Sequence, residues 1–175
     1  FQGNKYIFHV IHKNDGCCWA YAFSSYLSMA RVQIPDRVTR IEWNAFEGCT
    51  SLTAIVVGGL NRQFSSLEGV LFNKSQTGLI LCPGGKAGSC TIPDTVTSIE
   101  WKAFSGCTSL TAIEVGELNP QFSSREGVLF NKRQTRLLAC PGAKAGNYTI
   151  PDSVTSINQK AFIGCTRLTN VTIPD

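Results

Sequence analysis

Residues 150–175 read IPDSVTSINQKAFIGCTRLTNVTIPD, and the opening triplet Ile-Pro-Asp returns after 23 positions. The same triplet opens the two earlier segments 34–91 and 92–149, so a longer period of 58 residues runs through the chain without insertion or deletion. These two segments are identical at 43 of 58 positions and differ at 15, and 150–175 is a partial third unit. A fixed period of this kind indicates a repeat architecture, in which each unit completes its core only by stacking on its neighbours.

The 23-residue unit contains the pattern LxxIxV, which is typical of a short strand whose apolar side chains point into a core while the residues between them face water. The Pro of the IPD triplet prevents a helix from continuing, and the Gly of the AFxGC segment allows the chain to turn. We predict that the Phe residues of AFxGC, namely Phe46, Phe104 and Phe162, are buried at equivalent places. The pattern comprises Leu52, Ile55 and Val57, then Leu110, Ile113 and Val115, and finally Leu168, Val171 and Ile173.

These units resemble the BspA-type leucine-rich repeat family. The regular part reads IPDxVTxIxxxAFxGCTSLTxIxV, and the intervening FSSxEGVLFNKxQTxLxxCPGxKAGxxTIP resembles the irregular repeats that alternate with it in that family. The chain departs from the family pattern where Glu42, Glu100 and Asn158 stand in place of the usual Gly. The resemblance covers residues 34–175 and implies a right-handed leucine-rich-repeat solenoid, with short parallel strands stacked turn on turn over roughly six turns.

Residues 1–33 match none of the repeats. Alternation over residues 6–11 indicates a strand, and the apolar residues of 19–30 recur with a helical period after Asp15, which is a suitable N-cap. The first turn of a solenoid otherwise exposes its core. We therefore predict that 1–33 is an N-terminal capping segment made of one strand and one amphipathic helix, followed by the solenoid.

Two other interpretations of this segment involve chemistry. The sequence GCCWA at 16–20 resembles the nucleophile motif of papain-like cysteine proteases, but that mechanism needs an imidazole to accept the thiol proton, and no His follows His12. A zinc site at His9, His12, Cys17 and Cys18 has suitable ligand types. However, the adjacent Cys residues lack the usual spacer, and the two His residues fall on opposite faces of a strand. We predict no catalytic residue, no metal and no cofactor, so that the chain is not an enzyme.

Five of the eight cysteines occupy repeat-equivalent positions. Positions 58 residues apart are separated by at least two turns, roughly 10 Å at the usual strand spacing, whereas a disulfide needs Cα atoms within about 7 Å. We predict that these five are buried, unbonded thiols, and a bridge between Cys82 and Cys90 is the one alternative that geometry leaves open. The five are Cys49, Cys107 and Cys165 at one position, and Cys82 and Cys140 at another.

Two tryptophans, Trp43 and Trp101, are also repeat-equivalent, and Gln159 takes their place in the third unit. The replacement indicates partial exposure, and an exposed aromatic ring could stack on a sugar. Packing between turns is the interpretation that we favour for both rings.

The composition is that of a globular protein, with 43% apolar and 16% charged residues. The net charge of +4 comes from scattered Lys and Arg residues, so the basic patch typical of nucleic-acid binding is missing. No run of 18 apolar residues occurs, and we predict no membrane insertion. The sequence begins at Phe1 without a recognisable signal, and we expect it to be part of a longer chain.

The resemblance implies a noncatalytic recognition or adhesion module, located outside the cell or on its surface, that binds an extracellular or host-surface protein or glycan. Two alternatives remain open at this stage: an accessory region of a papain-like cysteine protease, or a structural spacer without a specific ligand. The outward positions of the LxxIxV strands should line up across a sheet and form the binding face. The candidate ligand-binding residues are Thr53, Val56, Thr111, Glu114, Asn170 and Thr172.

Overall fold

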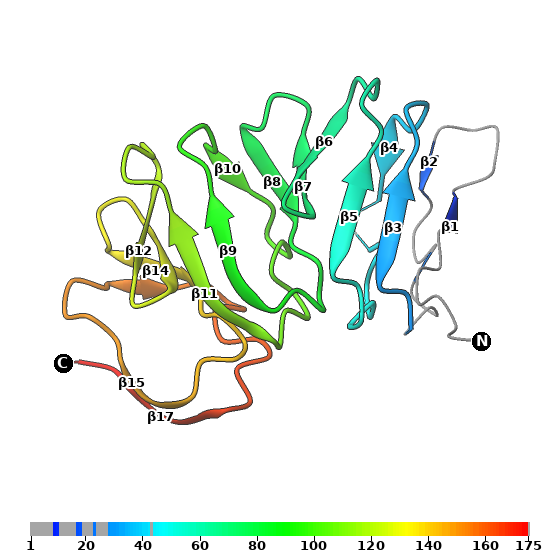
Figure 1. Cartoon of the computed structure of the whole chain (residues 1–175). Coiled ribbons are helices and arrows are strands. Elements are labelled where there is room, and N and C mark those ends of the chain that lie inside the picture. The colour runs from blue at the N-terminus through cyan, green and yellow to red at the C-terminus, as the bar shows by residue number, and fades with distance from the viewer. Residues whose placement is uncertain (1–8, 11–16, 19–22, 24–27, 43, 175) are drawn as a thin grey trace.

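The structure is a computed structural model, and it describes residues 9–10, 17–18, 23, 28–42 and 44–174. All regular elements in these ranges are β-strands, and Figure 1 shows them stacked in sequence order from one end of the molecule to the other. The stack makes about six turns. The predicted solenoid of short strands, with little helix in the repeat region, is confirmed.

One side of the stack is built from the LxxIxV strands and their neighbours. Its strands are β1 (His9–Val10), β3 (Arg31–Ile34), β5 (Ala54–Val57), β9 (Gly88–Ile92), β11 (Leu110–Val115), β15 (Gly146–Thr149) and β17 (Leu168–Thr172). They form three separate parallel sheets, in the orders β1-β3-β5, β9-β11 and β15-β17. Each LxxIxV strand therefore pairs in parallel with a neighbour, as predicted.

The opposite side of the stack carries shorter strands. They are β2 (Cys17–Cys18), β4 (Arg40–Ile41), β6 (Phe64–Leu67), β7 (Val70–Asn73), β8 (Gly78–Leu81), β10 (Ser98–Ile99), β12 (Phe122–Arg125), β13 (Val128–Asn131), β14 (Arg136–Ala139) and β16 (Ser156–Ile157). They form one pair, β2-β4, and two four-stranded sheets, β6-β7-β8-β10 and β12-β13-β14-β16. Only the last step of each four-stranded sheet is parallel.

The irregular segments form antiparallel hairpins, which the sequence analysis did not predict. Strands β6 and β7 are joined by Glu68 and Gly69, and both residues have positive φ, 50° and 81°. Two consecutive residues with positive φ make the type of turn whose twist suits a two-residue hairpin. A Cβ atom at Gly69 would lie 2.9 Å from the Cβ of Ala54, so the turn also needs Gly because it packs closely against β5. Gly127 repeats this contact against β11.

The core runs between the two sides of the stack. The prediction that all LxxIxV apolar residues point inward was wrong for Ile173, which is 67% exposed, and Leu168 and Val171 are half-buried. In the first two units, Leu52, Ile55, Leu110 and Ile113 are fully buried. Val32, beside Ile55, and Cys90, beside Ile113, are equally inaccessible to solvent, because parallel pairing places one apolar row directly beside the next. This shared row explains why a single unit cannot form a stable core.

The Phe residues of AFxGC do not all behave alike, so the prediction of equivalent burial was wrong for two of them. Phe46 is buried, and its ring stacks on Phe23 with the ring centroids 5.1 Å apart. Phe104 and Phe162 are only half-buried. Phe104 faces a cleft instead of a second aromatic ring, and Phe162 meets Tyr148 in a tilted contact at 6.4 Å. The buried residue common to all three turns is the Ala before each Phe.

Few residues of the predicted capping segment are described, and its role as a cap stays a prediction. Strand β1 falls within the predicted strand and pairs in parallel with β3. The predicted helix is not confirmed: Cys17 and Cys18, at its expected start, form β2 and pair with β4. Residues 19–22 and 24–27, which would form most of the helix, lie outside the described residues.

A buried asparagine ties consecutive turns together on the loop that follows each of the first two LxxIxV strands. The Nδ2 group of Asn119 donates to the carbonyl oxygens of Pro93 and Val96, both at 2.9 Å. Its Oδ1 atom accepts from the backbone N–H groups of Gln121 at 2.9 Å and Phe122 at 2.8 Å. Asn61 makes the equivalent four bonds one unit earlier. This side chain fully satisfies its donors and acceptors in the interior, as a buried amide must.

Candidate functional site

The six candidate binding residues lie on or beside the LxxIxV strands. Thr53 directly precedes β5 and Val56 lies within it, Thr111 and Glu114 lie in β11, and Asn170 and Thr172 lie in β17. Five of the six are exposed and Val56 is half-buried. Their neighbours in register are also polar: Gln33 lies beside Val56, Thr91 beside Glu114, and Thr149 beside Thr172.

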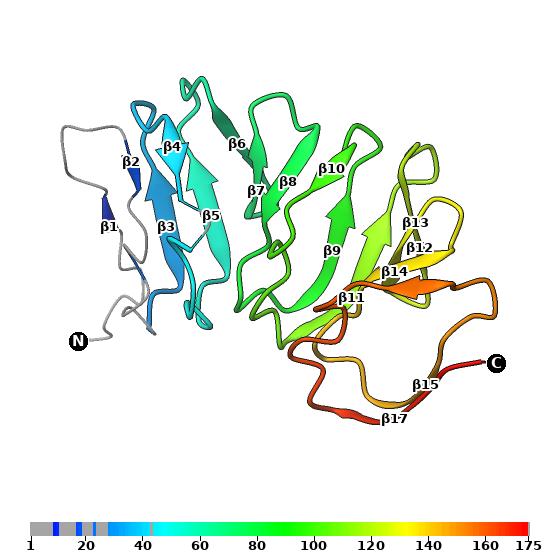
Figure 2. The ribbon, with the colours of Figure 1, turned by 180° about the vertical axis from the view of Figure 1, so that it is seen from behind.

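These candidates do not form one continuous row. The first two sheets end at β5 and β11 because the following hairpin occupies the free edge of each strand. Ile55 donates its N–H to the Gly69 carbonyl at 2.9 Å, and Ile113 donates to the Gly127 carbonyl at 2.8 Å. Figures 1 and 2 also show that the strands change direction, from upright in β3 and β5 to nearly horizontal in β15 and β17. The structure therefore separates the six residues into three patches.

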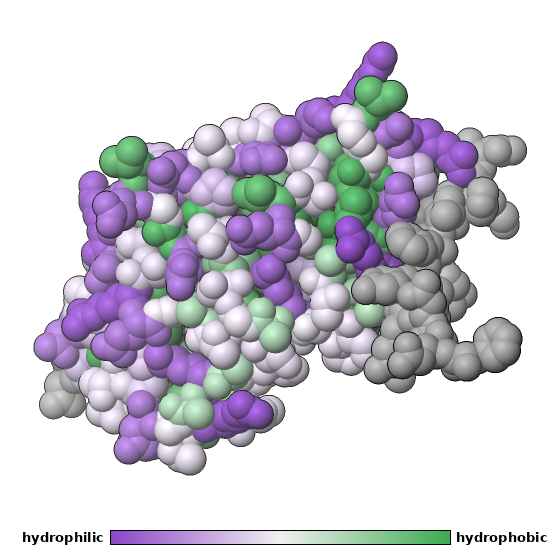
Figure 3. All heavy atoms as spheres, in the orientation of Figure 1, coloured by the Kyte–Doolittle hydropathy of each residue, from purple (hydrophilic) through white to green (hydrophobic). Residues whose placement is uncertain are grey.

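Local hydrogen bonds fix some of these side chains. The Thr53 hydroxyl donates to the Ala30 carbonyl at 2.9 Å, and Asn170 Nδ2 lies 3.4 Å from the Thr172 hydroxyl. Glu114 forms no ion pair within the described part of the chain. The exposed face in Figure 3 is mostly hydrophilic or neutral, and its hydrophobic areas are separate from one another. The strand surface can thus offer hydroxyl, amide and carboxylate groups to a ligand.

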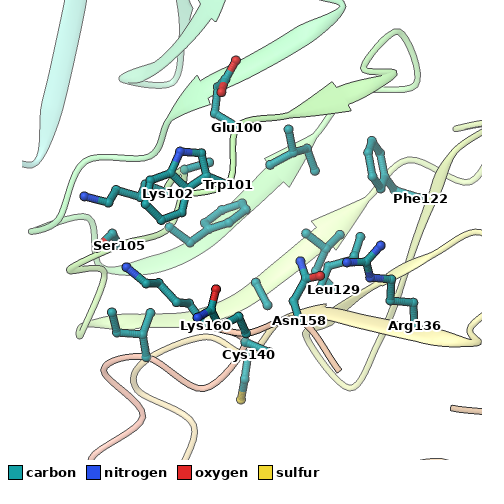
Figure 4. A pocket seen from close by; sticks show the side chains of 18 residues that line it. Glu100, Trp101, Lys102, Ser105, Phe122, Leu129, Arg136, Cys140, Asn158 and Lys160 are labelled. Atoms are coloured by element: carbon teal, nitrogen blue, oxygen red, sulfur yellow. The ribbon is translucent and has the colours of Figure 1, made fainter. Parts of the chain in front are cut away.

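A cleft of about 350 Å³ opens on the opposite side of the stack, where β10 faces the sheet that contains β12, β13 and β14. Figure 4 shows Trp101 and Lys102 at one end of this cleft, Phe122 and Arg136 at the other, and Asn158 and Lys160 along its lower edge. None of the six candidate strand residues lines it. Sequence reasoning missed the cleft, although the replacement of Trp101 by Gln159 one unit later was a partial signal for it.

The indole of Trp101 is 62% exposed, so the expectation that this ring packs between turns was wrong. The Nζ atom of Lys102 lies 4.8 Å from a ring centroid of Trp101, and that of Lys160 lies 4.7 Å away. Both distances are within the range of a cation–π interaction, which holds the two ammonium groups beside the ring. Lys102 also pairs with Glu47 at 3.4 Å. Trp43, the equivalent of Trp101, lies outside the described residues.

The five repeat-equivalent cysteines are all unbonded, as predicted, and four are buried while Cys165 is half-buried. Cys82 and Cys90 are both buried free thiols, so the alternative of a bridge between them is not realised. A hydrogen bond with Cys82, followed by burial, raises the pKa of the Cys90 thiol. For Cys140 the causes are a hydrogen bond with Cys165 and then burial, and its pKa is also raised. Thiols in this state are protonated and poor nucleophiles.

The segment considered for a catalytic Cys or a zinc site is described only in part. His12 lies outside the described residues, and for His9, Cys17 and Cys18 the structure describes short backbone strands alone. Among the residues that are described, no group of three His, Cys, Asp or Glu side chains is placed to hold a metal ion. In the same ranges, no helix is long and apolar enough to cross a membrane.

The repeat region has known relatives. A sequence profile of the BspA-type leucine-rich repeat region matches residues 19–77, 81–135 and 139–175, in six copies. The chain belongs to the BspA-type leucine-rich repeat family. The profile begins within the segment expected to be a cap, and the boundary at residue 33 stays a prediction.

Solved structures of two other proteins have a similar fold. A leucine-rich repeat protein from Eubacterium ventriosum is 29% identical, with a TM-score of 0.56, over 83% of this chain and 36% of its own. The pneumococcal vaccine antigen PcpA is 20% identical, also with a TM-score of 0.56, over 84% of this chain and 34% of its own. This BspA-type chain thus spans about a third of the length of both proteins. The comparison with curated proteins gives no match.

Proposed function

We propose that this BspA-type chain is a noncatalytic recognition or adhesion module that acts outside the cell or on its surface. Its partner is an extracellular or host-surface protein or glycan, bound through side chains on the solenoid surface. The observation that carries this proposal is the distribution of differences between units. Of the 15 positions at which 92–149 differs from 34–91, nine are exposed in 92–149 and one, Tyr148, is buried. A repeated framework with a varied exterior is how a solenoid presents different binding groups.

The proposed binding face consists of Thr53, Val56, Thr111, Glu114, Asn170 and Thr172. The backbone at these positions is fixed by strand pairing or by turn contacts, so a ligand would lose little free energy to ordering the protein. Short side chains leave the face accessible, and the unit-to-unit change from Val56 to Glu114 to Thr172 varies its chemistry. Three patches on one solenoid suit a partner that spans several turns.

The experiment is a binding screen against immobilised extracellular-matrix proteins and a glycan array. For a partner found there, the double variant Glu114→Arg, Thr172→Arg should weaken binding at least about tenfold, or about 1.4 kcal/mol. Its melting temperature should stay close to that of the wild type, because both residues are exposed.

A matched control is Glu117→Arg, Thr166→Arg, which makes the same chemical changes at exposed turn residues outside the strands. We expect this control to bind as the wild type does. Equal affinity of the strand variant and the wild type would move the binding site away from the strands. If no member of the panel binds, the interpretation as a structural spacer replaces the proposal.

A further inference from the structure

The cleft beside Trp101 occupies a junction that occurs twice in the solenoid. A space of about 60 Å³ lies at the first junction, between 34–91 and 92–149. The cleft at the second junction has a volume of about 350 Å³. The two linings share five equivalent positions, among them Phe46 and Phe104, Lys102 and Lys160, and Leu81 and Ala139. Some of these shared positions carry different side chains in the two units.

One difference between the units removes side-chain volume at the second junction. Leu81 lines the small space, whereas Ala139 stands at the same place in the large one. Replacing Leu by Ala removes most of the side chain, and a rigid framework relaxes only partly into the space that is left. The backbone around both positions is held by equivalent strand pairs, β7 with β8 and β13 with β14, so it has no freedom to collapse.

Three further substitutions change the charge of the junction. Lys102 pairs with Glu47 at the first junction, but the counterpart of Glu47 at the second is Ser105. Within the described part of the chain, Lys160 consequently forms no ion pair. Gly78 is replaced by Arg136, which adds a guanidinium to the rim. Lys102 itself stands in place of Asn44. The second junction has thus lost one carboxylate and gained two cations, while Glu100 remains as a carboxylate of the lining.

The differences between units are concentrated here. Of the 15 positions at which 92–149 differs from 34–91, five line the cleft. Five of the 15 positions are half-buried, and four of those half-buried positions line the cleft. The five that line the cleft are Lys102, Ser105, Arg136, Leu138 and Ala139. Half-buried positions in a repeat are normally restricted by packing. Their joint replacement gives a larger and more positive space.

We propose that this cleft is an anchor pocket for an acidic peptide segment of a partner protein. A single large apolar side chain of that segment enters the cleft, while carboxylates next to it meet Lys102, Lys160 and Arg136. This inference rests on the proposed recognition function and names its site and partner chemistry. The cleft volume is at the low end for ligand pockets, which suits one side chain. Trp and Arg, both present at the rim, are the residue types most enriched at the energetic centres of interfaces.

The lining favours a peptide over a saccharide. The interior of the cleft is formed largely by Ile99, Phe104, Phe122, Leu129 and Leu138. Sugar hydroxyl groups buried against these side chains would lose their bonds to water without gaining protein partners, whereas an aromatic or aliphatic side chain loses nothing by entering. The polar groups that could bind a charged flank lie around the mouth of the cleft (Figure 4).

The test is a selection from a random peptide library displayed on phage, carried out on the wild-type chain. We expect the enriched peptides to contain a large apolar residue flanked by Asp or Glu. The best of them, made as a labelled synthetic peptide, should bind more weakly as NaCl rises from about 0.05 M to about 0.5 M, because salt screens exposed charges. Enrichment of neutral or basic peptides, or of none, would overturn the proposal.

Three variants then locate the site of that synthetic peptide. Ala139→Leu places in the cleft the residue that the first unit already carries, and Lys160→Glu reverses an exposed charge without touching the core. Each should weaken binding at least about tenfold, whereas Lys74→Glu, at an exposed turn outside the cleft, should change it less than about twofold. Lys160→Glu keeps the test decisive if Ala139→Leu lowers stability.

Other outcomes separate this site from the proposed strand face. A peptide that binds both cleft variants normally but is lost with Glu114→Arg, Thr172→Arg overturns the cleft and supports the strand face. A saccharide that binds on the glycan array and is lost in Ala139→Leu also overturns the proposal, in favour of a sugar site. In a further outcome, the matrix-protein and glycan screen gives no partner while the cleft variants still lose peptide binding. That combination would support the cleft as a binding site and leave the strand face without support.

Discussion

Replacing Asn119 with Ala tests whether the buried asparagine holds consecutive turns together. The side chain is 0% exposed and makes four hydrogen bonds of 2.8 to 2.9 Å. A typical intramolecular bond contributes about 1 kcal/mol net, and a buried group left without a partner costs about 1 to 3 kcal/mol. Gln121 is exposed and Pro93 half-buried, so their backbone groups can regain water. We therefore expect Asn119→Ala to lower the free energy of unfolding by about 3 kcal/mol.

Thermal and urea denaturation followed by circular dichroism would measure this loss. For a chain of this size, about 3 kcal/mol corresponds to a fall in Tm of roughly 6 to 12 °C. The matched control is Asn147→Ala, which removes an exposed amide with one side-chain bond, to Thr169, and should cost less than about 0.5 kcal/mol. Hydrogen exchange should also accelerate at the amides of Gln121 and Phe122. Equal stability of the two variants would refute the reasoning.

Two more predictions concern aromatic residues. Burial raises the pKa of Tyr148 to about 12 from an ordinary 10.0. The folded state favours the neutral phenol, so the Tyr148 phenol stabilises the fold fully below about pH 10, and this contribution is lost as the pH rises towards about 12. Urea denaturation at about pH 9 and about pH 11 should therefore show a larger loss of stability in the wild type than in Tyr148→Phe. Phe46→Ala should cost about 3 to 5 kcal/mol, and Phe104→Ala about 2 kcal/mol because its ring is only half-buried. Equal losses in the free energy of unfolding for Phe46→Ala and Phe104→Ala would contradict this prediction, because they would show that Phe104 is packed as tightly as Phe46.

The sequence predicted the stacked parallel strands well, because the pattern LxxIxV specifies which side of each strand is buried. Ile55 and Ile113 are both inside, and Thr53 and Thr111 both outside. The unbonded cysteines followed from the period alone, since positions two turns apart are too distant to bond. The buried side of each strand follows from the alternation of apolar and polar residues, and the absence of disulfides follows from the repeat period. Both can be read from the sequence alone.

The hairpins and the cleft could not be predicted in the same way. The turn residues Glu68 and Gly69 lack the Asn-Gly or Asp-Gly signature that usually marks a two-residue hairpin. The cleft that Trp101 lines is also lined by Ala139, 38 positions further along the chain, and pattern reasoning has no access to a volume shared by such distant residues. Asn119 was missed because a polar residue in a loop is ordinarily expected to face solvent.

The hairpins that close the first two sheets also affect how the gene can gain or lose repeat units. Because Gly69 and Gly127 close the edges of β5 and β11 in the same way, an in-register crossover between the DNA encoding 34–91 and 92–149 joins halves that already fit each other. Such a recombination lengthens or shortens the protein by one 58-residue unit, and the residues on the two sides of the new junction pack as they do in the parent. We expect alleles of this gene to differ in length by multiples of 58 codons, with the number of wide junctions set by how many units carry Ala at the position of Ala139.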